Sequence, residues 1–306
     1  MSIQVLSRDP ETGAIRIQKN GGGALRLAVF TDLHFDGFDP VGMLQTKHWL
    51  RCQTEALRPD LIAVLGDTAL CPYNRGRTQR FAALMESLGV PWTAVLGNHE
   101  GEGKRVLTRR DTVACYQTSA RFLGYAELPG VTGYGNQMLE IVGPDGRPMQ
   151  RLWFMDSGGG RQGHSYVQKD QTDWLRRTAA DGTVPGMVFL HVPLHQYQAA
   201  YEALARGEAE LIRGQWRESV CLGGGPDQSD ALVEAARAAG VWAFVCGHDH
   251  SNDFDLFYQG MHYIYTQSGG YSRLCYDARS RGVRGCTVYE IETDGRVTVR
   301  QNRNPK

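Results

Sequence analysis

Five short motifs in the sequence, each directly after an apolar run, carry side chains that bind metal ions. The motifs read "TDLH" at 31–34, "LGDT" at 65–68, "GNHE" at 97–100, "FLHVP" at 189–193 and "CGHDH" at 246–250. A lone Asp at a strand end is more commonly a cap, and a lone His is more commonly a hydrogen-bonded core residue. Five such motifs in succession instead indicate a metal site. Carboxylate, amide and imidazole ligands without thiolate favour Mn, Fe, Zn or Co over Cu(I) or an iron–sulfur cluster.

The last motif contains a thiol, which raises the question of whether a cysteine belongs to the metal site. Side chains at i and i+2 of an extended segment share a face, so His248 and His250 are expected to point the same way. Cys246 is then the end of a buried strand, and Asp249 lies beside the ligands or in a loop. The seven cysteines of the chain form no C-x-x-C pair. We expect them to be reduced and mostly buried.

The elements that position these motifs alternate along the chain. Apolar runs at 24–32, 60–67 and 91–100 predict buried strands, and residues 43–58 and 77–88 predict the helices between them. This β-α-β-α-β order favours parallel pairing with helical crossovers. Ligands bind outside the carboxyl ends of such strands, so all five motifs are expected to converge at one edge. Their spread along the sequence favours a single domain over the whole chain, residues 1–306.

The remainder of the chain predicts hairpins and two further helix–strand units. Turn sequences at 144–146 and 293–295 predict two hairpins, and residues 1–23 predict a third. The helix–strand units are expected at 171–193 and 230–250. Mixed sheets covered by helices fit this order better than one doubly wound sheet.

Composition and charge exclude several classes of partner. The chain has 306 residues, with 33 Lys plus Arg against 33 Asp plus Glu, so no net field attracts it to nucleic acid or to an anionic membrane. No window approaches the roughly 18 apolar residues of a spanning helix, and the first residues do not form a signal peptide. We expect a cytoplasmic protein without nucleic-acid or membrane partners, and the oligomeric state stays open. Neither a G-x-S-x-G motif nor a P-loop is present.

The five motifs together resemble a known family. "DLH", "GD", "GNHE", a lone His and "GHDH" resemble the signature blocks of the calcineurin-like metallophosphoesterase superfamily. The longer segments "HVPLHQY", "ESVC" and "CGHDHSNDF" are similar to segments of the purple-acid-phosphatase-like branch known from plants and fungi. This resemblance implies a four-layer α-β-β-α sandwich with two mixed sheets. It also implies two divalent or trivalent metal ions, most commonly Mn, Fe or Zn, at the strand C-terminal ends.

The resemblance also implies a role for each motif residue. The first metal would be held by Asp32, His34, Asp67 and His250, and the second by Asp67, Asn98, His191 and His248. His99 follows a ligand without being one, and would face the leaving group as a general acid.

The implied activity is hydrolysis of phosphate esters by attack of a metal-bridging hydroxide. Only two anionic ligands, Asp32 and Asp67, would face two divalent cations, and about two surplus positive charges suit a phosphate dianion. The narrower resemblance to purple-acid-phosphatase-like proteins suggests a phosphomonoesterase, which would act on a small phosphorylated substrate or a phosphoprotein. Two alternatives stay open: a phosphodiesterase, including one for cyclic nucleotides, and a non-catalytic binding module with the same fold.

One departure from the purple branch concerns metal ligation. Purple enzymes have a tyrosine ligand shortly after the bridging Asp, where this chain has Leu70. We therefore expect no ferric-tyrosinate colour. Tyr73 is past that spacing, so packing is its expected role.

A second departure concerns substrate contacts. His195 and Gln196 stand where the branch tends to have a Pro-Glu pair. His195 could contact substrate or could simply lie on the rim. Arg105, next to Lys104, could bind phosphate oxygens in a bidentate manner or belong to a solvated loop. The segment 196–227 is either a lid over the metals or an ordinary surface helix with a loop.

Overall fold

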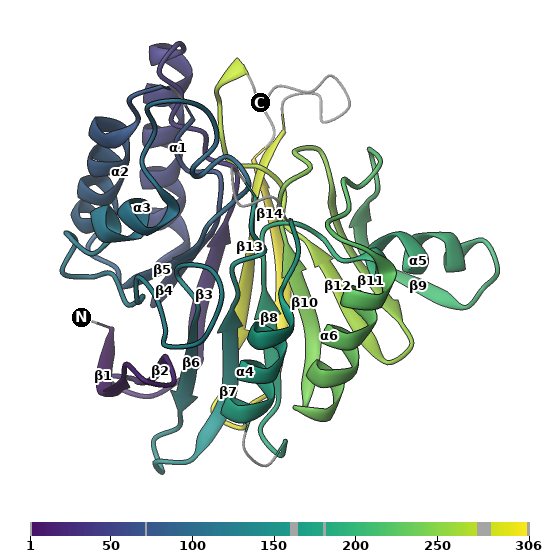
Figure 1. Ribbon diagram of the computed structural model, residues 1–306. Helices are drawn as coiled ribbons and strands as arrows, with labels where there is room; N and C mark the ends of the chain where they lie inside the picture. The colour runs from purple at the N-terminus through teal and green to yellow at the C-terminus, as the bar shows by residue number, and fades with distance from the viewer. Residues whose placement is uncertain (1, 71, 160–164, 180–181, 274–282, 305–306) are drawn as a thin grey trace.

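The computed structural model describes residues 2–70, 72–159, 165–179, 182–273 and 283–304. Two β-sheets pack face to face, and helices cover the outer face of each sheet (Figure 1). This is the four-layer α-β-β-α arrangement expected from the sequence. Both sheets contain parallel and antiparallel pairs, so the expectation of two mixed sheets is also confirmed.

The larger sheet has nine strands within the described residues. Their spatial order is β1 (Ile3–Asp9), β2 (Ala14–Lys19), β6 (Gln137–Val142), β7 (Pro148–Phe154), β8 (Gly186–Phe189), β10 (Val241–Cys246), β12 (Met261–Tyr265), β11 (Asp253–Tyr258) and β9 (Ala209–Gln215). The centre of this sheet is parallel, because β8 pairs with β7 on one side and with β10 on the other in the same direction.

The smaller sheet has five strands. Their spatial order is β14 (Val297–Asn304), β13 (Arg284–Ile291), β3 (Leu25–Phe30), β4 (Leu61–Leu65) and β5 (Trp92–Val95). Strands β3, β4 and β5 are parallel, as predicted from their helical crossovers. Their carboxyl ends therefore deliver the first three motifs to one edge.

Six helices are described, three on each outer face (Figure 1). They are α1 (Pro40–Leu57), α2 (Arg75–Ser87), α3 (Arg109–Tyr116), α4 (Lys169–Ala179), α5 (His195–Leu204) and α6 (Pro226–Ala238). Trp49 of α1 and Phe81 of α2 pack against the smaller sheet. Trp174 of α4 and Tyr197 of α5 pack against the larger sheet.

The two inner sheet faces share one apolar core. Leu27 and Leu65 from the smaller sheet belong to the same buried cluster as Leu152, Phe189 and Val245 from the larger sheet. Burial of this apolar area from both sheets is the main force that joins them. A common core supports the single-domain interpretation of residues 1–306, which stays a prediction.

Most predicted elements are present, with shifted ends. Helix α1 begins three residues before the predicted 43, because Asp39 caps it by accepting a hydrogen bond from the Gly42 N–H at 2.9 Å, with Pro40 in the first turn. The three predicted hairpins are confirmed as the antiparallel pairs β1–β2, β6–β7 and β13–β14. Helix α3 and strands β9, β11 and β12 were not predicted.

The segment 196–227 begins with the predicted helix, α5, and then departs from both interpretations of it. Residues Ala209–Gln215 form β9, the edge strand paired with β11, so this part belongs to the sheet instead of overhanging the metals. A lid stays a prediction only for residues 216–225. In the ranges that the structure describes, no helix combines the length and apolarity needed to cross a membrane.

Candidate metal centre

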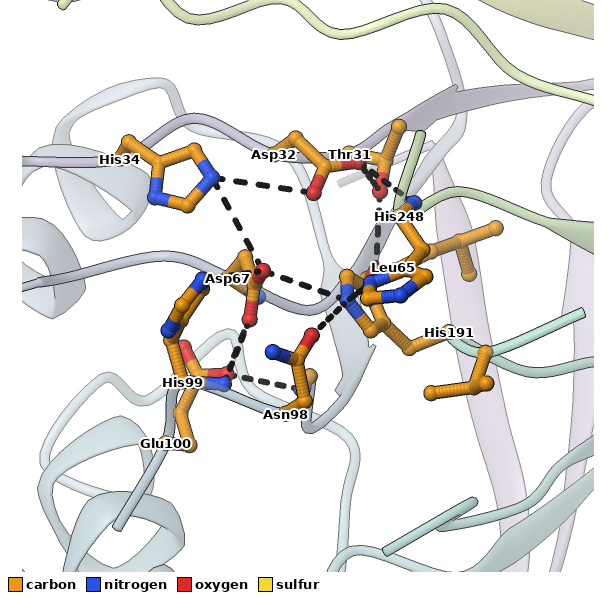
Figure 2. A network of polar contacts seen from close by, with 12 residues as sticks. Thr31, Asp32, His34, Leu65, Asp67, Asn98, His99, Glu100, His191 and His248 are labelled. Carbon is orange, nitrogen blue, oxygen red and sulfur yellow. Dashed lines mark hydrogen bonds and ion pairs between the residues drawn. The ribbon is translucent and has the colours of Figure 1, made fainter. Parts of the chain in front are cut away.

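The five motifs meet where the two sheets end side by side. Strands β3, β4 and β5 of the smaller sheet precede Asp32, Asp67 and Asn98, and strands β8 and β10 of the larger sheet precede His191 and His248. Figure 2 shows these side chains pointing toward a common space from loops on both sheets. The convergence predicted from the sequence is therefore present.

One group of side chains consists of Asp32, His34 and His250. The Nε2 atoms of His34 and His250 face each other at 3.1 Å. The Oδ1 atom of Asp32 lies 3.8 Å from the His34 nitrogen and 3.7 Å from the His250 nitrogen. These are the residues that the resemblance assigns to the first metal.

A second group surrounds the Nε2 atom of His191. That nitrogen lies 3.2 Å from Oδ2 of Asp67, 3.0 Å from Oδ1 of Asn98 and 3.2 Å from Nδ1 of His248. The Nδ1 atom of His191 donates a hydrogen bond to the carbonyl oxygen of Leu65 at 2.6 Å. This bond orients the ring, so that Nε2 is the atom that can bind metal.

The carboxylate of Asp67 connects the two groups. Its Oδ2 atom lies 3.8 Å from Nε2 of His34 and 3.2 Å from Nε2 of His191 (Figure 2). The other oxygen, Oδ1, accepts a hydrogen bond from the backbone N–H of His99 at 3.0 Å. One oxygen therefore borders both candidate sites, as a bridging carboxylate would.

Positive backbone φ angles concentrate at this site. Asp32, His34, Asp67 and His248 have φ values of 51°, 38°, 50° and 88°. Non-glycine residues rarely adopt such angles, and each costs of order 1–3 kcal/mol that the surrounding structure must offset. The local fold holds these ligand residues in conformations that would not form without it.

Glycines next to the ligands permit close approach of the loops. A Cβ atom on Gly97 would lie 2.1 Å from Oδ1 of Asp67, and one on Gly247 would lie 2.0 Å from Oγ1 of Thr31. Both distances are too short for real atoms. The glycines of "GNHE" and "GHDH" are therefore required by packing.

Protonation differs between the two groups in the metal-free chain. Burial lowers the pKa of His34 to about 4, so that its imidazole is neutral. Burial also lowers the pKa of His191, but the adjacent Asp67 carboxylate outweighs burial and raises it to about 10. His191 and Asp67 thus hold a proton between them that a metal ion would displace.

His99 lies beside the ligands without joining either group. Its Nε2 atom is 3.9 Å from Oδ2 of Asp67, its Nδ1 atom hydrogen-bonds the carboxylate of Glu102, and its side chain is 32% exposed. Burial lowers the pKa of His99, but the Asp67 and Glu102 carboxylates together raise it above its ordinary value. A charged imidazole at the open side of the site can donate a proton.

Glu100 is the last residue of "GNHE", and the sequence predicted no role for it. Its side chain is buried, and its carboxylate accepts hydrogen bonds from the backbone N–H groups of Gly97, Asp67 and Thr68. These bonds tie the second motif to the third. A glutamate two positions after the predicted ligand Asn98 was the signal available in the sequence.

Arg109 stabilises the loop that carries "GNHE". It is buried, donates to the carbonyl oxygens of Gly97 and Glu100 at 2.6 and 2.8 Å, and forms an ion pair with Asp156. No motif links Arg109 and Asp156, which are 47 positions apart, so the sequence offered no signal for this pair.

The structure answers the question about the "CGHDH" cysteine. Cys246 ends β10 and is fully buried, as predicted. The assumption of an extended segment is wrong, because the strand stops at Cys246 and His248 has positive φ. His248 and His250 nevertheless reach different groups. Asp249 accepts hydrogen bonds from the Tyr265 hydroxyl and the Cys221 N–H, so it braces the loop.

Cysteine burial was predicted only in part. Three of the five described cysteines are buried, whereas Cys52 and Cys221 are exposed. Cys71 and Cys275 lie outside the described residues.

The two predicted substrate contacts lie apart from the ligand groups. His195 begins α5 and donates through Nε2 to the carbonyl oxygen of Gly224 at 3.0 Å. Arg105 lies over the ring of Tyr73 and hydrogen-bonds its hydroxyl. Tyr73 is 62% exposed, so it packs on the surface and contacts Arg105. Substrate roles for His195 and Arg105 stay predictions.

The donor set fits a pair of metal ions. Imidazole nitrogens and carboxylate oxygens from far-apart segments converge in these two groups, and a third group of Cys221, His248 and Asp249 shares His248 with the second. The buried Nδ1 atom of His34 has no hydrogen-bond partner within the part of the chain that the structure describes. Two imidazole nitrogens facing each other at 3.1 Å suit a cation that accepts both lone pairs.

The chain belongs to the calcineurin-like phosphoesterase family, because the model of that family matches residues 25–252, about three quarters of the sequence. Its resemblance to purple-acid-phosphatase-like proteins is also confirmed. It is 27% identical to the probable inactive purple acid phosphatase 14 of Arabidopsis thaliana, over 85% of this chain and 74% of that protein. It is 23% identical to the phosphatase DCR2 of Saccharomyces cerevisiae, over 82% of this chain and 48% of the yeast protein.

Two solved structures share the fold of this chain. A dimetal phosphatase from Danio rerio superposes with a TM-score of 0.63 at 14% identity, covering 91% of this chain and 96% of that one. A purple acid phosphatase from yellow lupin seeds gives a TM-score of 0.52 at 15% identity, covering 94% of this chain and 54% of that one. The family implies a dinuclear metal centre, and the structure contains two candidate ligand groups for it.

Proposed function

We propose that this chain is a dinuclear metal-dependent phosphoesterase that prefers phosphate monoesters. The observation that carries the proposal is the Oδ2 atom of Asp67, which borders both ligand groups, beside an imidazole, His99, whose pKa is raised. The first metal would be held by Asp32, His34, Asp67 and His250, and the second by Asp67, Asn98, His191 and His248. Mn, Fe or Zn suits these ligands.

The metals and the chain have separate tasks in this mechanism. Two bound metal ions supply Lewis acidity, which lowers the pKa of a water molecule and offsets phosphate charge. Asp67 would be the carboxylate shared by both metal ions. Glu102 accepts a hydrogen bond from the Nδ1–H of His99. The Nε2 proton of His99 then passes to the leaving oxygen as the water oxygen bonds to phosphorus and the old P–O bond breaks, and the proton that the attacking water gives up to solvent is replaced on His99 from solvent. The products are an alcohol and inorganic phosphate.

The preference for monoesters rests on charge. Among the seven proposed ligands only Asp32 and Asp67 are anionic, so two divalent cations retain about two positive charges. A phosphate monoester dianion matches that surplus better than a diester monoanion. The substrate class is thus a small phosphorylated molecule or a phosphoprotein, and the cytoplasmic location stays a prediction.

A comparison of two nitrophenyl esters tests this preference. With the Mn-loaded protein, kcat/KM for nitrophenyl phosphate should exceed that for bis-nitrophenyl phosphate. A diester rate well above the monoester rate would replace the proposal with a phosphodiesterase on the same site.

A non-catalytic binding module is the second candidate, favoured by one observation. Three purple-acid-phosphatase relatives of this chain from Arabidopsis thaliana are named as probably inactive. This candidate would be preferred if the Mn-treated protein held less than about one metal ion per chain and hydrolysed neither ester.

A further inference from the structure

A pocket of about 610 Å³ lies on the His99 side of the candidate metal centre. Its walls come from three loops, and each loop follows a metal motif. Phe38 follows "TDLH", Leu70 follows "LGDT", and Glu102 and Val106 follow "GNHE". The same turns of chain that carry the proposed ligands therefore shape this pocket.

Hydrogen bonds connect the pocket wall directly to the reactive site. Glu102 bonds the Nδ1 atom of His99, the residue proposed to protonate the leaving oxygen. The backbone N–H of Asp36 donates to the carbonyl oxygen of His34 at 2.6 Å. Glu102 thus belongs both to the pocket wall and to the contact that holds His99, the residue proposed to face the leaving group.

The chemistry of the pocket is mostly apolar. Its apolar wall residues are Phe38, Leu70, Pro72 and Val106, and Lys104 adds one ammonium group to the wall. The carboxylate of Asp36 already accepts the N–H of Phe38 at 2.8 Å, and that of Glu102 is engaged by His99. Such walls offer few hydrogen bonds to a hydroxyl-rich leaving group and much contact area to a ring.

Phe38 is exposed to an unusual degree. Its side chain is 80% exposed, the highest value among the large hydrophobic residues that the structure describes. Burying such a ring is favourable, so a ligand that covers it gains affinity.

We propose that this pocket selects phosphate monoesters whose leaving group carries an aromatic ring. The proposal rests on the proposed function only for the position of the phosphate. It assigns to Phe38 and Leu70 the recognition of the leaving group, a role that neither the motifs nor the family assigns to them.

Calorimetry with non-hydrolysable phosphonates tests the pocket without turnover. The Mn-loaded protein should bind benzylphosphonate about tenfold more tightly than 2-hydroxyethylphosphonate, with a more negative ΔCp. Phe38→Ser and Leu70→Ala should each remove most of that difference and leave 2-hydroxyethylphosphonate unchanged. Leu44→Ser is the matched control, because Leu44 is also a large exposed residue, at 61%, but lies outside the pocket wall.

Several results would overturn the proposal. Equal affinity for the two phosphonates would do so, as would no loss on Phe38→Ser, or an equal loss on Leu44→Ser. The last result would indicate a broader apolar surface for a protein partner.

Turnover of benzyl phosphate and glycerol phosphate separates this proposal from the proposed function. Both esters have alkyl leaving groups, so the chemistry differs little between them. Hydrolysis of both at equal kcat/KM would refute the pocket and retain the phosphatase. A Phe38-dependent preference for benzylphosphonate without any hydrolysis would retain the pocket and refute the phosphatase.

Discussion

At the scale of single residues, Asp67, His99 and Glu100 have three different tasks in the site. Asp67 borders both ligand groups, whereas His99 donates its backbone N–H to Oδ1 of Asp67 and has its ring nitrogen Nε2 3.9 Å from Oδ2. Glu100 holds the two motifs together from the buried side. Adjacent positions thus face in different directions and have different tasks.

Removing the bridge and removing the acid should have different effects. Asp67→Asn should lose both metal retention and turnover, because both groups lose their shared anion. His99→Ala should lower kcat by about 10²–10⁴-fold and retain both metals. Metal analysis of the purified variants and steady-state kinetics check this division. Loss of metal from His99→Ala would show that His99 is a ligand.

Metal loading should release a proton at neutral pH. The raised pKa of His191, about 10, means that the metal-free chain holds a proton there at pH 7.5, while His34, with a pKa of about 4, holds none. Only neutral imidazole binds metal, so apparent affinity should rise with pH up to about 10. Calorimetry in two buffers of different ionisation enthalpy measures the released proton. Metal uptake with no proton release at pH 7.5 would contradict this assignment.

At the scale of elements, the loops after the strands are fixed by backbone geometry as much as by side chains. Four ligand residues have positive φ, and glycines precede Asp67, Asn98 and His248. A short strand followed by a strained turn aims its ligand into the space between the sheets.

Gly97→Ala should disrupt the site. The new Cβ would lie 2.1 Å from Oδ1 of Asp67, so the bridging carboxylate must move. We expect metal content to fall, as measured by metal analysis after Mn loading. Gly76→Ala is the control, because a Cβ on Gly76 meets nothing within 4 Å and this glycine lies in α2. Normal metal content in Gly97→Ala would show that the loop can shift to accommodate the new Cβ atom.

The buried Arg109 should matter far more than its exposed neighbour. Arg109→Leu leaves Asp156 buried without its cation, which should lower the free energy of unfolding by about 3–5 kcal/mol. Arg110→Leu breaks only an exposed ion pair with Glu127 and should change stability little. Urea denaturation of both variants measures the difference. Similar midpoints for the two variants would rule out a structural role for the buried pair.

At the scale of the whole molecule, the site depends on both sheets. Ligands follow strands of the smaller sheet and of the larger sheet, which meet through a common core. Metal ions bound here would therefore join the two halves of the sandwich. Stability and metal binding are expected to be linked.

Mn loading should raise the thermal midpoint of the chain, and a chelator should reverse the rise. Free metal at about 100 times its Kd stabilises the folded state by about 2.7 kcal/mol. His195→Ala should show the same rise as the unaltered chain, because His195 contacts none of the ligand groups. Scanning calorimetry with and without Mn is the measurement. If the thermal midpoint of the unaltered chain does not change when Mn is added, a structural link between the metals and the sheets is contradicted.

The apolar runs before the motifs predicted the strands and the convergence of the motifs at one edge, whereas the four layers and the two ligand groups were implied by the resemblance to metallophosphoesterases. Strand β9 was not predicted, since most of its residues are exposed and no alternation marks it. The positive φ of His248 has no sequence signal either, so the extended "CGHDH" was wrong. The buried pair of Arg109 and Asp156 exists only once the chain has folded.

The position of β13 has a consequence for the order in which the chain is made. Strand β13 (Arg284–Ile291) lies beside β3, whose carboxyl end carries Asp32 and His34. The first motif to be synthesised thus receives one of its two neighbouring strands only after all seven proposed ligands have been synthesised. Until residues 284–291 have been synthesised, β3 has an open edge and its motif lacks full support. Metal uptake is therefore expected to follow translation of the last hairpin, although every ligand has emerged by residue 250.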